Sequence, residues 1–165
     1  MVGRIGERVS VALLVFLVSS CSSETSEPST PEDPPTASAT ESDDPAAEAI
    51  TAYEHMWDVV VEASRDASPD HSDLDQYASG QAAALMRQGM EGVEEPLVGE
   101  PVHDIEVRSS DSSEVEIRDC MDASEWVEEG EPPSDDVDIR VDATISKDAL
   151  NWLVTDTRIW EPGTC

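Results

Sequence analysis

Apolar side chains in residues 45–96 recur three or four positions apart, which is the spacing of one face of an α-helix. The first run starts where Pro45 follows an aspartate that can cap a helix, and Pro69 breaks it. Its apolar face consists of Ile50, Tyr53, Trp57, Val60 and Val61. A second helical region follows, bends at Gly80 and closes at Pro96. The pattern predicts an amphipathic helix of about five turns and a shorter helical region after it.

Beyond residue 101 the period changes from 3.6 to 2, so that apolar and polar side chains alternate as they do in a half-buried strand. The alternation covers four segments, 102–108, 115–118, 137–145 and 152–159. Successive strands with one apolar face predict an antiparallel sheet that is solvated on its other face. Helices followed by such a meander form an α+β fold, with the N-terminal helices packed on a sheet of about four strands.

The N-terminus has a different pattern. Two arginines precede an almost unbroken apolar run, Val9 to Val18, whose length of about ten residues is half of what a membrane-spanning helix needs. This is the layout of an export signal. The end of the run, Val18-Ser19-Ser20-Cys21, resembles the lipobox of bacterial lipoproteins. The resemblance implies that residues 1–20 are removed and that Cys21 is lipidated, with palmitate among its acyl chains. The alternative is an ordinary secretory signal in which Cys21 is incidental.

Charge and composition limit how the exported chain meets a membrane. Its 165 residues include 9 Lys+Arg and 38 Asp+Glu, and removal of residues 1–20 leaves 7 basic and 37 acidic side chains. Such a chain is repelled by nucleic acid and by anionic headgroups, so membrane contact must come from the lipid. Residues 22–44 contain only Ser, Thr, Pro, Ala, Glu and Asp, which predicts a disordered tether. We therefore expect a signal peptide (1–20), a lipidated tether (21–44) and one domain (45–165), on the outer face of the cytoplasmic membrane.

Two cysteines remain when Cys21 carries lipid. Cys120 and Cys165 form an even pair in an oxidising compartment, and we expect a disulfide between them. Closure of a loop of about 46 residues contributes roughly 4 kcal/mol in the chain-entropy model. Two free thiols are the alternative. A metal site is disfavoured because neither cysteine has another Cys or a His at ligand spacing.

Several short motifs together resemble one family. They are Tyr53 with Trp57 on the first helix, Leu74-x-x-Tyr77-Ala78-x-Gly80, Gly99-x-Pro101, Asp119-Cys120-x-Asp122-x-Ser124, Trp152 on the last strand and the terminal Cys165. Residues 45–165 are thereby similar to the small secreted or lipid-anchored NTF2-like domains of actinobacteria. The resemblance implies a curved sheet wrapped around the helices as a cone, with the disulfide joining the second strand region to the C-terminus. The long acidic segment 128–136 departs from the family pattern.

The resemblance also indicates where a site would lie. NTF2-like cones often hold a pocket between helix and sheet, and Tyr53, Trp57, Tyr77 and Trp152 are suited to line it. The alternative is that these aromatic side chains form the core of a small domain. Ketosteroid-isomerase relatives of this fold use a pocket carboxylate as base, for which Asp119 and Asp122 are the candidates. The alternative for these two is a surface or turn-capping acid, and no catalytic residue is assigned.

Other chemistry has little support in the sequence. The three histidines, His55, His71 and His103, are not paired at ligand spacing. Gly-x-Ser-x-Gly, a phosphate loop and a dinucleotide fingerprint do not occur. The aspartates at 135, 136 and 138 lack the glycine and terminal glutamate of a calcium loop and are interpreted as a solvated acidic loop. We expect neither a metal nor a cofactor.

Three functions stay open at this point. The first is a lipid-anchored accessory or binding module, which a filled cone would favour. The second is a small-molecule enzyme of the ketosteroid-isomerase type, which a pocket above about 300 Å³ with a buried carboxylate would favour. The third is a carrier of a small apolar ligand, which a dry and open apolar pocket would favour. Whether the chain is an enzyme is left open, and its partners would be the membrane, through the lipid, and a small apolar ligand.

Overall fold

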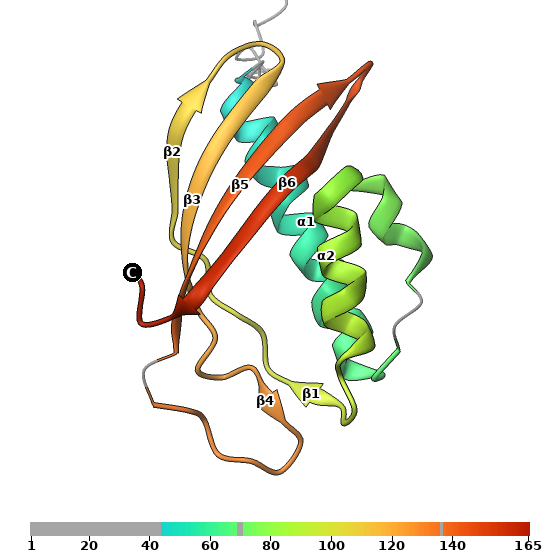
Figure 1. Cartoon of the computed structure of the whole chain (residues 1–165), viewed down its shortest axis with the longest axis vertical. Helices are drawn as coiled ribbons and strands as arrows, with labels where there is room; N and C mark the ends of the chain where they lie inside the picture. Colours follow the sequence, from blue (N-terminus) through green and yellow to red (C-terminus); the bar gives the residue numbers. More distant parts are fainter. Residues whose placement is uncertain (1–43, 69–70, 136) are drawn as a thin grey trace, which may run out of the picture. The chain divides into compact units, whose positions relative to one another are not determined.

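Two helices pack against one face of an antiparallel sheet in the computed structural model of this chain (Figure 1). The structure describes residues 44–68, 71–135 and 137–165, all within a unit that spans residues 40–165. The export signal, Cys21 and nearly all of the tether lie outside the described residues. Among the described residues, no helix has the length and apolar character needed to cross a membrane.

The first helix, α1, spans Pro45–Arg65 and agrees with the prediction. Asp44 caps it, because a carboxylate oxygen accepts a hydrogen bond from the amide of Ala46 at 3.1 Å. The second helical region is divided. A 3₁₀-helix, η1, covers Ser72–Gln76, and the α-helix α2 covers Gly80–Glu91. The predicted bend at Gly80 is the start of α2, where a φ of +57° suits a residue without a Cβ.

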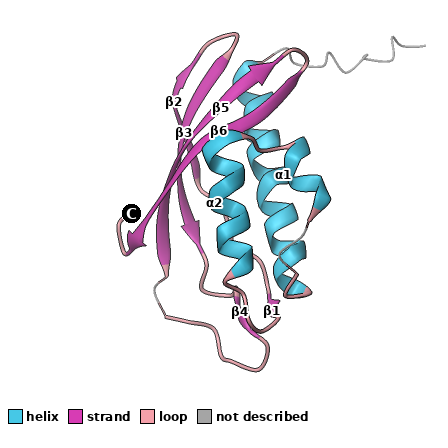
Figure 2. Cartoon of the chain, turned by 45° about the vertical axis from the view of Figure 1, so that its right-hand side comes forward, coloured by secondary structure: helices cyan, strands magenta, loops and turns pink. Residues whose placement is uncertain are grey.

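The sheet has four strands in the order β2-β3-β5-β6, and every neighbouring pair is antiparallel. The strands are β2 (Ile105–Ser110), β3 (Glu114–Asp122), β5 (Asp138–Asp148) and β6 (Asn151–Pro162). Two short strands, β1 (Leu97–Val98) and β4 (Val127–Glu128), form a separate pair. The larger sheet is curved and does not close (Figure 2). The predicted α+β fold with a meander of about four strands is therefore confirmed.

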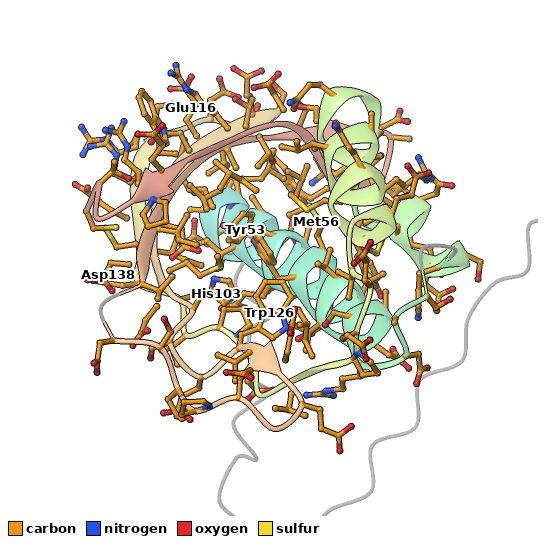
Figure 3. All side chains as sticks on the ribbon, turned by 60° about the horizontal axis from the view of Figure 1, so that its bottom comes forward. Tyr53, Met56, His103, Glu116, Trp126 and Asp138 are labelled. Carbon is orange, nitrogen blue, oxygen red and sulfur yellow. The ribbon has the colours of Figure 1, made fainter. Side chains whose placement is uncertain are left out.

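Alternation along the strands separates the core from the outer face of the sheet. On β3, Val115, Ile117, Asp119 and Met121 are buried, whereas Glu116, Arg118 and Cys120, which alternate with them, are more exposed. Tyr53 and Met56 of α1 lie beneath the arch of the sheet, and Glu116 lies on its outer side (Figure 3). The sheet thus buries one apolar face against the helices and leaves the other in solvent.

The chain ahead of α2 fixes this helix to the edge of the sheet. Val154 of β6 donates its amide to the carbonyl of Tyr77 at 2.8 Å, and its own carbonyl accepts from Ser79 at 2.9 Å. The side-chain amide of Gln81 then bonds both backbone groups of Thr157, at 2.8 and 3.0 Å. These bonds satisfy part of an otherwise unpaired strand edge and hold the start of α2 against β6.

Candidate functional site

An apolar cavity of about 540 Å³ lies between α1, α2 and the end of the sheet near β1 and β4. Its lining is mostly large apolar side chains: Trp57, Val60, Leu85, Met86, Met90, Val93, Met121, Trp126, Ile139 and Ile159. Ser64, Gln88, Gly89 and Gly92 complete it. Gly89 is exposed and Ile159 is 42% exposed, so the cavity opens to solvent beside α2.

The taper of the helix–sheet interface explains the cavity. At the start of α2, where Gln81 bonds β6, the buried side chains are the small ones of Ala82 and Ala83. One to two turns later the buried residues are the larger Met86 and Met90, and here α2 diverges from β6 (Figures 1 and 2). Since this half of α2 has no hydrogen-bonded strand beside it, the space between the elements is filled only in part.

Trp126 closes the cavity on the side of β4 (Figure 3). Its indole nitrogen donates to Ser64 Oγ at 3.2 Å, and this hydroxyl donates in turn to the carbonyl of Val61 at 2.7 Å. The ring meets Trp57 edge to face, with centroids 6.2 Å apart. Sequence reasoning did not select Trp126; its only signal was one large aromatic residue within an acidic, irregular stretch.

The four aromatic residues predicted for a pocket are distributed over two places. Tyr53 and Trp57 are neighbours on α1, with ring centroids 6.4 Å apart, and of these two Trp57 lines the cavity. Trp152 lies elsewhere, and its indole nitrogen donates to Glu48 at 2.7 Å. Tyr77 shares with Trp152 a separate surface depression, where its ring faces His55 at 5.0 Å.

A buried polar cluster surrounds Asp119, one of the two carboxylates selected from the sequence. Asp119 has no exposed surface, and its Oδ2 accepts from Tyr53 Oη at 2.9 Å and bonds His103 Nδ1 at 2.6 Å. Its other oxygen accepts from the amide of Asp104 at 2.9 Å. Because an ionised carboxylate cannot donate, we assign the proton of this short contact to His103 Nδ1. Burial, and then the charge of Asp119, raise the pKa of Tyr53 well above its ordinary value.

The cluster ties α1 and the segment before β2 to β3. Both oxygens of Asp119 are occupied, and Asp119 lines neither the apolar cavity nor the polar groove of about 580 Å³ that His103 borders. The carboxylate of Asp119 therefore holds Tyr53, His103 and the backbone of Asp104 in place, and it presents no free oxygen to a substrate in the cavity or in the groove. The contact between His103 and Asp119 could not be predicted from the sequence, because the pairing of β2 with β3 brings the two residues together and no local motif links them.

Asp122, the second selected carboxylate, is exposed. It accepts a hydrogen bond from the amide of Ser124 at 2.9 Å, and that bond lowers the pKa of its carboxyl. This is the turn-capping interpretation considered from the sequence.

The cysteine pair lies at the end of the sheet. Cys120 is half-buried on β3, and Cys165 is exposed at the C-terminus, which a bond from Gly163 N to the carbonyl of Asp138 (2.7 Å) holds beside β5. Both are free thiols in this structure. Desolvation, followed by the neighbouring Cys120 and the carboxylates of Asp138 and Asp119, raises the pKa of the Cys165 thiol to about 12. The disulfide stays a prediction, with its partners already adjacent.

The histidines are separated, each with its own contacts: His55 on Tyr77, His71 at 3.8 Å from Glu62, and His103 on Asp119. In the part of the chain that the structure describes, no three His, Cys, Asp or Glu side chains are grouped so as to hold a metal ion. Comparisons with protein-family models, with curated proteins and with solved structures gave no match for this chain.

Proposed function

We propose that this chain is a lipid-anchored, extracytoplasmic binding module whose NTF2-like cone holds a small apolar molecule in the cavity between α1, α2 and Trp126. The observation that carries the proposal is the cavity itself. Its volume of about 540 Å³ falls in the range of ~300–1,000 Å³ that is typical of small-molecule sites. A lining of aliphatic, methionine and tryptophan side chains favours an apolar occupant.

The type of side chain in the lining supports a binding site over a packing fault. Met86, Met90 and Met121 are flexible and polarisable, so they can adjust to ligands of different shapes. Trp57 and Trp126, packed edge to face, form a rigid part of the same lining. A lining that combines adaptable and rigid side chains is suited to retaining an apolar body with little hydrogen bonding.

The enzyme alternative has weaker support. A base of the ketosteroid-isomerase type must present a carboxylate to the pocket. Asp119 is buried, but its oxygens are bonded to Tyr53, His103 and Asp104, and it does not line the apolar cavity. The geometry therefore favours a carrier or binding module over a proton-transfer enzyme.

Fluorescence titration with N-phenyl-1-naphthylamine, an uncharged apolar probe, tests the cavity. We expect saturable binding and energy transfer from the two tryptophans that line it. Gly89→Trp should weaken binding about tenfold or more, because Gly89 lines the cavity and a Cβ at this position meets no atom within 4 Å, which leaves open space that an indole can occupy. Gly89→Ala is the matched control and should bind normally. Unsaturable binding, or equal affinity in both variants with the fold intact by circular dichroism, would overturn the cavity assignment.

The anchor is tested separately. Replacement of Cys21 by Ser should release the protein from the membrane fraction into the medium, because the lipid supplies its membrane affinity. Retention of this variant in the membrane fraction would contradict the anchoring part of the proposal and leave the cavity unaffected.

A further inference from the structure

The apolar cavity shares part of its lining with a second space. This outer depression has a volume of about 570 Å³ and is lined mainly by the segment between β3 and β5. Trp126 and Ile139 line both the apolar cavity and the outer depression. The two spaces are therefore neighbours, and the side chain of Trp126 lies at the boundary between them.

The outer depression is similar in chemistry to the cavity. Besides Trp126 and Ile139, its apolar lining consists of Ala123, Val127, Pro132, Pro133 and Val137, and its polar lining of Glu128, Glu131 and Ser134. Neither space has a lysine, arginine or histidine in its described lining. An anionic ligand would lose its hydration there without gaining a cationic partner, which is costly. Both spaces therefore favour an apolar ligand without a negative charge.

The backbone on either side of Trp126 is held in place. The strand β4 follows Trp126 directly and pairs with β1. The amide of Ala123 donates to the carbonyl of Val137 at 3.1 Å, and the amide of Ser134 donates to the carbonyl of Ser124 at 2.9 Å. Movement of this loop as a unit would break several of these bonds.

The side chain of Trp126 has fewer restraints than its backbone. The indole has a single donor, which bonds Ser64 Oγ at 3.2 Å, and its ring meets Trp57 edge to face. The Ser64 hydroxyl also donates to the carbonyl of Val61, and this second bond does not involve Trp126. A neutral hydrogen bond changes an equilibrium constant by roughly fivefold. Rotation of the half-buried indole about its own side-chain bonds therefore breaks fewer contacts than movement of the loop.

We propose that Trp126 is a movable partition, and that the apolar cavity and the outer depression together form one site for an elongated apolar molecule. This proposal rests on the proposed function and adds the shape of the ligand to it. One end of the ligand lies among the methionines of the cavity, and the other lies in the outer depression against Pro132 and Pro133. With the indole bonded to Ser64 the cavity takes a compact ligand, and with the indole rotated it takes a long one.

Two uncharged probes of different length test this site. N-phenyl-1-naphthylamine is compact, whereas all-trans-retinol is long and too stiff to fold into the cavity alone. Both fluoresce, so each can be excited directly and titrated separately. We expect saturable binding of both probes to the unmodified domain. Gly89→Trp, which fills the cavity, should weaken the binding of both about tenfold or more.

A variant that fills only the outer depression separates the two probes. Ser134 is exposed and lines this depression but not the cavity, so Ser134→Trp should weaken retinol about tenfold or more and leave N-phenyl-1-naphthylamine unchanged. Glu129→Trp is the matched control, because Glu129 is exposed in the same loop and lines neither space. It should leave the affinity for both probes unchanged. Circular dichroism checks that each variant is folded.

The partition itself is tested through its hydrogen bond. Ser64→Ala removes the acceptor that holds the indole, so the affinity for retinol relative to N-phenyl-1-naphthylamine should rise several-fold. The ratio is the readout, because the loss of a hydroxyl from the cavity lining acts on both probes.

The outcomes separate this inference from the proposed function. Failure of retinol to bind where N-phenyl-1-naphthylamine binds, or equal effects of Ser134→Trp on the two probes, would overturn the extended site and leave the cavity function in place. An unchanged ratio in Ser64→Ala would overturn the role of Trp126 as a partition. Failure of both probes to bind would overturn the cavity function itself.

Discussion

Tyr53→Phe is the sharpest test of the polar cluster beneath the sheet. The substitution keeps a ring that is fully buried and removes the hydroxyl that donates to Asp119 at 2.9 Å. Asp119 then keeps two donors, His103 and the amide of Asp104. A hydrogen bond to a charged group contributes about 1.5–3 kcal/mol, so the free energy of unfolding at pH 7 should fall by about that amount. Urea titration followed by tryptophan fluorescence measures it.

The pH dependence gives a second and independent readout. Burial, followed by the charge of Asp119, raises the pKa of Tyr53 in the folded protein. In the unfolded chain the phenol loses its proton near its ordinary pKa of about 10. The folded state therefore holds a proton that the unfolded state has released, and stability falls as the pH rises above about 10 toward the folded pKa. The loss contributed by this one group is at most about 1.4 kcal/mol per pH unit.

Tyr53→Phe lacks this group, so the gap between wild type and variant should narrow from pH 9 to pH 11. Tyr77→Phe, at the half-buried tyrosine, is the control. Because the Cys165 thiol also has a raised pKa, about 12, all proteins should carry Cys120→Ser and Cys165→Ser. Parallel stability curves for wild type and Tyr53→Phe across this range would refute the reasoning, as would a change below about 0.5 kcal/mol at pH 7.

Two further predictions concern the loop that carries Trp126 and the C-terminal tail. Gly99→Ala should lower the melting temperature far more than Gly130→Ala: both glycines have positive φ, but a Cβ at Gly99 would lie 1.9 Å from the carbonyl oxygen of Glu125, and one at Gly130 meets nothing within 4 Å. Equal decreases in melting temperature for the two variants would mean that the positive φ alone destabilises them and that the clash with Glu125 has no effect. In protein purified without reductant, Cys120 and Cys165 should resist alkylation, and reduction should lower the free energy of unfolding by roughly 4 kcal/mol. Prompt labelling of either thiol would contradict the disulfide.

Elements with a long and regular pattern were predictable from the sequence. The aspartate cap and the apolar stripe indicated α1 close to its observed bounds, Pro45–Arg65, because both signals are local. Alternation indicated β5 and β6 as a hairpin for the same reason. The pair of β1 and β4 was not predicted, since strands of two residues are too short to show a period and lie in an irregular, acidic part of the chain.

The sites depend on contacts that no local pattern contains. Asp119 meets His103 because β2 and β3 pair with Ile105 opposite Asp119, which brings the segment before β2 alongside β3. The sequence selected Asp119 for its place at a strand end beside a cysteine, and it predicted neither the burial of this carboxylate nor its hydrogen-bond donors. The apolar cavity was still harder to predict from the sequence. Its size depends on the distance between α2 and the sheet, and several elements contribute side chains to the space between them.

That distance is controlled at two points with different chemistry. At the start of α2, directional hydrogen bonds from Gln81 to Thr157 fix the helix to β6. At the other end, Met90 packs without such a bond, and the wall opposite is Trp126, held through Ser64. Hydrogen bonds fix a geometry, whereas methionine contacts allow several. Ligands of different width should therefore be accommodated by movement of the C-terminal half of α2, with its start and the sheet left in place.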